Sequence, residues 1–242
     1  MQPNIHKQDQ PVSHPLFHSH PALWAQVADA VRVKHFANDD RIVSHSDEAS
    51  GLWLVLKGWV TLSRQTPDGK ETIIGLCTEG DIFGEAALFP NANYPYTAEA
   101  SGKETELAMI PAPVIRAQVA KNGSLSNHIM SMLSDRVGQA QLKLEQINTM
   151  SASQRLGCFL LRLCVTQESG SKTLHIPIEK NILAAYLGMK PETFSRSQQQ
   201  LKPLGILVSG DKVNIENISA LREFVCGSCS ESGSCDVEDA AE

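Results

Sequence analysis

The spacing of apolar residues divides the chain into a strand-rich first part and a helical second part. From residue 35 to about residue 110, short apolar runs alternate with turn residues. Residues 52–56 and 59–62 are predicted as two strands with a bend at Gly58, and residues 73–76 continue the series. Pro67-Asp68-Gly69 suits a turn, because Pro fixes φ and Gly permits positive φ. This pattern predicts a jelly roll or barrel.

Beyond Pro113 the apolar period changes to three or four residues. A narrow stripe over residues 123–150 is typical of a coiled-coil seam, and we expect this helix to form a homodimer. A single amphipathic helix packed on its own domain would show a related but usually wider stripe. The stripe consists of Ile129, Leu133, Val137, Ala140, Leu144 and Ile147.

Residues 151–225 predict a winged helix-turn-helix. A helix over residues 151–165 and a polar loop over 167–172 come first. Ala184 and Gly188 are small residues four apart, which would let two helices cross closely, and Gly188 suits the turn between them. Pro191 suits the first position of the second helix. Residues 206–215 then predict a hairpin, the wing.

The second helix carries side chains that can read DNA. Glu192, Ser195 and Arg196 are spaced i, i+3 and i+4, so they share one face. Arg offers a bidentate donor to guanine, Glu accepts from cytosine, and Ser contacts a base edge or a thymine methyl group. The alternative is an ordinary amphipathic helix with a solvated polar face. The turn, the helix start and the wing agree with one another and favour DNA binding.

Charge supports this assignment once the chain is divided. The net charge of the 242 residues is −6, but residues 151–225 hold nine Lys and Arg against six Asp and Glu, for a net charge of +3. Residues 1–150 and 226–242 are net −4 and −5. The predicted DNA module is therefore the only positive part, as phosphate neutralisation requires.

No apolar run is long enough to cross a bilayer, and the N-terminus lacks the pattern of a secretory signal. We therefore expect a cytoplasmic protein with no membrane partner. In that compartment, cysteines are reduced thiols or metal ligands. The six are Cys77, Cys158, Cys164, Cys226, Cys229 and Cys235.

Two segments carry a family resemblance. Residues 80–89, Gly-Asp-Ile-Phe-Gly-Glu-Ala-Ala-Leu-Phe, resemble the GD-x-x-GE-x-x-LF segment of the CRP/FNR superfamily of transcription regulators. Residues 192–196, Glu-Thr-Phe-Ser-Arg, resemble the FNR-type E-x-x-S-R reading triad. Residues 93–94 and 97–100, with Pro191, most resemble the DNR branch, whose members regulate denitrification in response to nitric oxide.

The resemblance implies an α+β chain in five parts: a loose arm over residues 1–20, a β-roll (jelly-roll) effector domain over 21–122, a dimerisation helix over 123–150, the winged helix-turn-helix over 151–225 and a Cys-containing acidic tail over 226–242. It implies a homodimer that binds double-stranded DNA at a TTGAT-like palindrome and contacts RNA polymerase. The implied DNA-binding residues are Lys190, Glu192, Thr193, Ser195 and Arg196. The implied effector pocket consists of Gly84, Glu85, Tyr94, Tyr96 and Thr97.

The sequence of the expected pocket differs from that of cyclic-nucleotide-binding members, which place an Arg about ten residues after the GE pair. Residues 92–97, Ala-Asn-Tyr-Pro-Tyr-Thr, contain neither Arg nor Lys. A cyclic phosphate would find no cation there. We therefore expect that cyclic AMP is not the effector, and the resemblance to the DNR and FNR branches implies a response to nitric oxide or oxygen. The alternatives are a small organic ligand in the β-roll, or a sensor module that does not bind DNA.

Two cofactors could carry such a signal. Cys226, Cys229 and Cys235 suit an iron–sulfur cluster or zinc, resembling Gram-positive FNR-type regulators, with Asp135 as a fourth ligand; the alternative is a disordered acidic tail. Haem, implied by the DNR resemblance, needs an axial ligand, most often histidine. The candidates for that ligand are His14, His18, His20, His35, His45, His128 and His175.

An enzyme is not expected. The chain has no phosphate loop, nucleophile elbow or paired-carboxylate motif. His18-Ser19-His20 has the spacing of a cupin metal motif, but it precedes the strands and lacks the following Glu.

Overall fold

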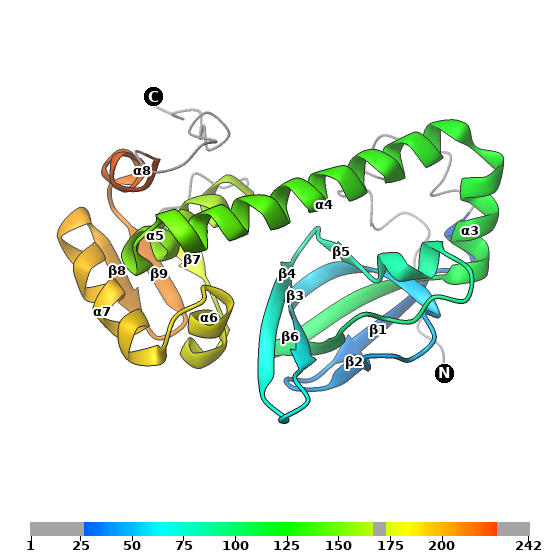
Figure 1. The fold of residues 1–242 in the computed structure, drawn as a ribbon, viewed down its shortest axis with the longest axis horizontal. Coiled ribbons are helices and arrows are strands. Elements are labelled where there is room, and N and C mark those ends of the chain that lie inside the picture. The colour runs from blue at the N-terminus through cyan, green and yellow to red at the C-terminus, as the bar shows by residue number, and fades with distance from the viewer. Residues whose placement is uncertain (1–26, 167–172, 227–242) are drawn as a thin grey trace. The chain divides into compact units, whose positions relative to one another are not determined.

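The computed structural model describes residues 27–166 and 173–226. The chain forms two compact units, residues 1–135 and 136–242, and the division falls within a long helix, α4 (Gly123–Thr149) (Figure 1). Within the described residues, no helix is long and apolar enough to span a membrane. The structure is of mixed α and β type, as the sequence predicts.

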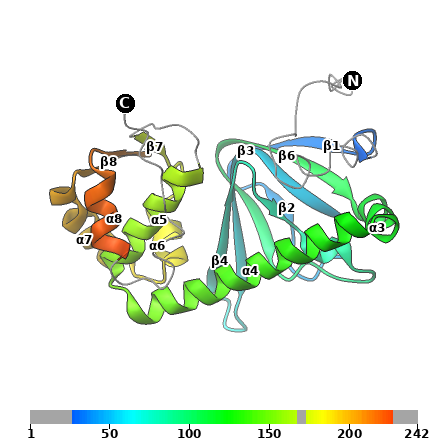
Figure 2. The same cartoon turned by 90° about the horizontal axis from the view of Figure 1, so that it is seen from above.

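The first unit is built around one curled antiparallel sheet (Figure 2). Its path runs β1-β6-β3-β4, while β2 pairs with β6 and β5 pairs with β3. A short 3-10 helix, η1 (Glu85–Leu88), and helix α3 (Ala112–Lys121) belong to the same unit. The strands are β1 (Arg32–Phe36), β2 (Arg41–Val43), β3 (Gly51–Gln65), β4 (Glu71–Thr78), β5 (Ile82–Phe83) and β6 (Thr97–Pro111).

The prediction of two strands separated by a bend at Gly58 was wrong, because β3 continues through it. Gly58 has a φ of +88°, and a Cβ there would lie 2.6 Å from the carbonyl oxygen of Glu104. The register between β3 and β6 shifts at this point. Glycine therefore lets the strand pass an irregularity without ending.

The sheet buries side chains on both faces. Alternate residues of β3 point to opposite sides, so Leu52 and Leu54 join one cluster while Trp53 and Val55 join another. This explains why residues 52–56 form an unbroken apolar run instead of alternating with polar residues. The cluster that contains Leu52 also receives Ile115 of α3 and Leu125 of α4.

Helix α4 corrects one position of the predicted dimer seam. Ile129 is only 6% exposed and lies in the cluster with Leu52, and Leu133 packs against that cluster. Ile129 therefore belongs to the core of its own chain. The apolar residues that α4 leaves exposed are Met130, Val137, Ala140, Leu144 and Ile147.

The described part of the second unit contains a three-stranded sheet of order β7-β9-β8, four α-helices besides the end of α4, and one 3-10 helix. The predicted helix-turn-helix and wing are present, and β7 and α8 are additions that we did not predict. The elements are α5 (Ala152–Thr166), β7 (Thr173–His175), α6 (Lys180–Tyr186), α7 (Pro191–Leu201), η2 (Lys202–Leu204), β8 (Ile206–Ser209), β9 (Lys212–Ile215) and α8 (Ile218–Cys226).

The close helix crossing in this unit lies at Gly157 of α5. A Cβ on Gly157 would lie 2.7 Å from Cγ2 of Val225 and 3.0 Å from Cδ1 of Leu221, both in α8. Gly188 instead supplies a positive φ of +66°, and a Cβ added there would lie no closer than 3.7 Å to its nearest neighbour, the side chain of Ile147. The tight turn predicted at Gly188 is confirmed, whereas its role in helix crossing was wrong.

Candidate functional site

Helix α7 exposes the side chains expected to read DNA. Pro191 occupies the first turn, where its missing N–H costs nothing, and Glu192 favours the positive end of the helix dipole. Glu192, Ser195 and Arg196 are exposed. Lys190, the N-cap residue, is also exposed, and Thr193 is half-buried. On the opposite face, the buried residues are Phe194, Ser197 and Leu201.

The hydroxyl of Ser195 has already used its proton. It donates a hydrogen bond of 3.1 Å to the carbonyl oxygen of Pro191, one helical turn earlier. In this rotamer the oxygen can accept a hydrogen bond but has no second proton to donate. Ser195 is therefore suited to an amine on a base edge or to a thymine methyl group.

The same exposed face continues beyond the predicted triad. Gln199 follows Arg196 by three residues and Glu192 by seven, and it is exposed. Sequence reasoning did not select it, although the same helical spacing that grouped the triad includes it.

The turn before α7 is held by backbone hydrogen bonds. The N–H of Met189 donates to the carbonyl of Ala184, and that of Gly188 donates to the carbonyl of Ala185, both at 3.0 Å. Leu183 and Leu187 are buried beneath the turn. The exit from α6 is thereby fixed, and α7 begins in a defined direction.

The wing adds a histidine–carboxylate pair. Nε2 of His175 on β7 lies 2.7 Å from Oδ2 of Asp211 in the β8–β9 turn, and both side chains are about half exposed. His175, a candidate haem ligand, is thus engaged within the DNA module. Among the described residues of this unit, the exposed lysines are Lys180, Lys190, Lys202 and Lys212.

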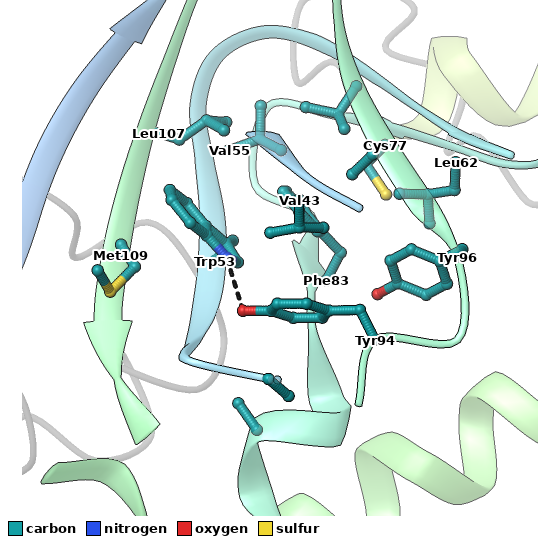
Figure 3. Close-up of a cluster of buried hydrophobic side chains, with 14 of the residues drawn as sticks. Val43, Trp53, Val55, Leu62, Cys77, Phe83, Tyr94, Tyr96, Leu107 and Met109 are labelled. Atoms are coloured by element: carbon teal, nitrogen blue, oxygen red, sulfur yellow. Dashed lines mark hydrogen bonds between the residues drawn. The ribbon is translucent and has the colours of Figure 1, made fainter. Parts of the chain in front are cut away.

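In the first unit, two of the five predicted effector residues, Tyr94 and Tyr96, lie in the core (Figure 3). Tyr94 is 2% exposed and Tyr96 8% exposed, beside Trp53 and Phe83. The rings of Trp53 and Phe83 are stacked, with centroids 6.1 Å apart. Both tyrosines are therefore part of a packed aromatic interior.

The two phenol groups bind the chain itself. The hydroxyl of Tyr94 accepts hydrogen bonds from the N–H of Gly51 (3.0 Å) and from Nε1 of Trp53 (3.3 Å), and it donates to the carbonyl of Gly51 (2.8 Å). The hydroxyl of Tyr96 accepts from the N–H of Gly84 at 2.7 Å. Tyr94 therefore bonds to the start of β3, and Tyr96 bonds to the backbone just before η1.

The Gly84–Glu85 pair lies against this interior. The hydroxyl of Tyr96 donates to Oε2 of Glu85 at 3.4 Å. Gly84 has a φ of +86°, and a Cβ there would lie 2.9 Å from the carbonyl oxygen of Gly51. The hydroxyl of Thr97 instead accepts a hydrogen bond from the N–H of His45.

Two of the four proposed metal ligands, Cys226 and Asp135, lie among the described residues. Cys226 is half-buried at the end of α8, and Asp135 is exposed on α4. Among residues 27–166 and 173–226, no three His, Cys, Asp or Glu side chains form a metal-binding group. Cys229 and Cys235 lie outside the described residues.

The remaining described cysteines and candidate histidines differ in how far they are exposed. Cys77 and Cys158 are buried, and burial raises the pKa of Cys164 to about 11. His35 and His45 are exposed and His128 is half-buried. His14, His18 and His20 lie outside the described residues.

Comparison with known proteins identifies both units. The family model of the cyclic nucleotide-binding domain matches residues 33–122, and that of the Crp-like helix-turn-helix domain matches residues 154–224. The structure of a regulatory protein from Silicibacter pomeroyi DSS-3, provisionally described as cAMP-binding, is 30% identical, with a TM-score of 0.66, over 86% of this chain and 90% of that one.

Two FixK proteins are also similar. The nitrogen fixation regulation protein FixK of Bradyrhizobium diazoefficiens is 26% identical over 72% of this chain and 73% of its own. FixK2 of Bradyrhizobium japonicum has the same fold, with a TM-score of 0.73 at 20% identity over 81% of this chain and 97% of that one. The chain belongs to the CRP/FNR family of transcription regulators.

Proposed function

We propose that this regulator binds, as a homodimer, a palindrome with TTGAT-like half-sites. The observation that carries the proposal is the joint exposure of Glu192, Ser195 and Arg196 on one face of α7. We assign Arg196 to the guanine of the half-site and Glu192 to the cytosine paired with it. Ser195, with its proton used, accepts from a base amine or touches a methyl group.

The exposed face of α4 supports the dimer. Val137 is 58% exposed, Leu144 63% and Ile147 44%. Met130, at 59%, lies seven residues before Val137, so an exposed apolar stripe follows a heptad spacing. A second copy of α4 is the occupant with a matching stripe, and it would pair the two reading helices for a palindrome.

The DNA-binding proposal is tested with duplexes that carry the palindrome and with all single-base variants of its half-site. Arg196→Ala should lose roughly tenfold or more in affinity for the palindrome and should relax discrimination at the guanine. Equal weakening on every duplex would assign Arg196 to phosphate and contradict the proposal. Lys202→Ala, which removes an exposed lysine after α7, is the control for loss of charge alone.

For the signal, we propose oxygen or nitric oxide and not cyclic AMP. The packed Tyr94 and Tyr96 side chains and the absence of a cation from residues 92–97 disfavour a cyclic phosphate. The Silicibacter pomeroyi structure, provisionally described as cAMP-binding, instead favours the cyclic nucleotide. Calorimetric titration with cyclic AMP decides between them, because measurable binding would contradict the proposal.

We propose that a metal centre or haem carries such a signal. The candidate ligands are Cys226, Cys229 and Cys235. Absorption spectra of anaerobically purified protein, full length and truncated after Val225, test this. Loss of iron or zinc on truncation supports the cysteines, and a Soret band retained after truncation supports haem.

We further propose RNA polymerase as a partner, which transcription from a palindrome-containing promoter would test.

A further inference from the structure

We propose that Gln199 is a fourth base-reading side chain and that it selects an adenine beyond the bases read by the predicted triad. The inference rests on the proposed DNA-binding function, which it extends to a further base position of the half-site.

The position of Gln199 on α7 is the first argument. Seven residues make almost two full helical turns, so Gln199 lies nearly in line with Glu192. It is three residues after Arg196 and four after Ser195, and it is exposed as they are. The buried side of the helix, which includes Leu201, points the opposite way. Gln199 therefore lies near the middle of the outward face.

Reach along DNA is the second argument. At about 1.5 Å per residue, the distance along the helix from Glu192 to Gln199 is roughly 10 Å. Base pairs are spaced about 3.4 Å apart, so the four side chains span about three steps. A helix lying in the major groove would then carry Gln199 past the bases that Glu192 and Arg196 contact.

Side-chain chemistry selects the base. A glutamine amide presents a donor and an acceptor side by side, which match N7 and the N6 amine of adenine in the major groove. Arg196 cannot make this contact, since guanidinium has donors only, and Glu192 as a carboxylate has acceptors only. Gln199 is thus the exposed residue of this face with the adenine pattern.

Its two neighbours have the same chemistry but different positions. Gln198 is half-buried and lines a small cavity with Val208 and Val213 of the wing sheet. Gln200 is exposed but is turned by about 100° from Gln199 around the helix. Gln200 therefore supplies a matched control with the same side chain on the same exposed helix.

The test uses the full chain and a pool of random-sequence duplexes, from which bound DNA is selected and sequenced for wild type, Gln199→Ala, Gln200→Ala and Arg196→Ala. Gln199→Ala should lose an adenine preference of about tenfold at one position in each half-site, the size of one bidentate contact. Gln200→Ala should keep the wild-type profile.

Two outcomes would overturn this inference. A Gln199→Ala profile identical to wild type would show no base contact, and even weakening on all duplexes would show a phosphate contact. If wild type itself selects no sequence, the proposed function fails with it. If wild type and Arg196→Ala differ as expected but Gln199→Ala does not, only the inference about Gln199 fails.

Discussion

The guanidinium of Arg155 donates a hydrogen bond of 2.9 Å to the carbonyl oxygen of Leu187, the residue that caps α6. A second nitrogen of the same group donates to the carbonyl of Met150, just after α4, at 2.8 Å. One side chain of α5 therefore joins the end of α4 to the turn that aims α7. Burial lowers the pKa of this guanidinium, which remains charged at neutral pH.

Arg155→Ala should lower the free energy of unfolding by about 1–3 kcal/mol, since hydrogen bonds from a charged group are lost. Affinity should fall for every duplex alike, because Arg155 positions α7 without being one of its exposed side chains. Arg155→Lys retains the charge but only a point donor, so it should restore part of the stability. Thermal unfolding and duplex titrations measure both effects, and an Arg155→Ala protein as stable as wild type would refute the role.

Gly157→Ala should destabilise the protein even though alanine favours helices. The new Cβ would overlap Val225 and Leu221 of α8, at a cost of about 1–3 kcal/mol. Gly138→Ala is the matched control on α4, where no atom lies within 4 Å of an added Cβ. It should stabilise by up to about 1 kcal/mol. If Gly157→Ala and Gly138→Ala shifted the urea midpoint of unfolding equally, this would argue against a tight α5–α8 contact.

Leu144→Asp should convert the proposed dimer to monomers. A carboxylate in the paired stripe would be buried without a partner, weakening association by about 3 kcal/mol or more. Sedimentation velocity over a concentration series measures this. Gln139→Asp places the same charge on an exposed position across the helix from the stripe and should leave association unchanged. A dimeric Leu144→Asp protein would mean that the interface lies elsewhere.

Tyr94→Phe should be more damaging than Tyr96→Phe. The hydroxyl of Tyr94 makes two hydrogen bonds with the backbone of Gly51 and one with the indole of Trp53. Its removal leaves these three buried groups without this partner, which should lower the free energy of unfolding by roughly 2–5 kcal/mol. Removing the hydroxyl of Tyr96 should cost about 1–3 kcal/mol. Chemical unfolding ranks the two, and the reverse order would mean that the contacts of Tyr94 are weaker than their geometry indicates.

Lys143 should make stability depend on alkaline pH. Burial and the charge of Arg162 lower its pKa from 10.5 to about 8. Between these values the unfolded chain holds a proton that the native chain has released, so stability due to this group rises from about pH 8 to about pH 10.5. Lys143→Arg, which stays charged, should lack this rise. A constant difference in melting temperature between the two proteins from pH 7 to pH 10 would contradict it.

The reading helix could be predicted because its period alone fixes which residues face out. Glu192, Ser195 and Arg196 share a face in any helix that begins at Pro191, and Phe194 must then face the core. The stripe on α4 could not be assigned in the same way. Ile129 and Met130 are adjacent and apolar, and only the folded core, in which Ile129 joins the cluster that contains Leu52, shows that Ile129 is the buried one.

Other features depend on contacts between distant segments. Strand β7 has only three residues and is defined by its pairing with β9, which local pattern does not encode. Tyr94 and Tyr96 could be linked to Gly84 through the family segment, but their burial against Trp53 requires the folded sheet. The role of Gly157 could not be predicted from the sequence either, because it depends on Val225 and Leu221 of α8, which lie against it in the folded chain.

Strand β3 has a mechanical consequence for the sensor unit. Trp53 faces the interior that holds Tyr94, while Leu52 and Leu54, on either side of it in sequence, face the cluster that holds Ile129. Packed interiors are nearly incompressible and transmit displacement. A displacement on the tyrosine side of the sheet is therefore transmitted to the start of α4 through one strand, because β3 belongs to both clusters.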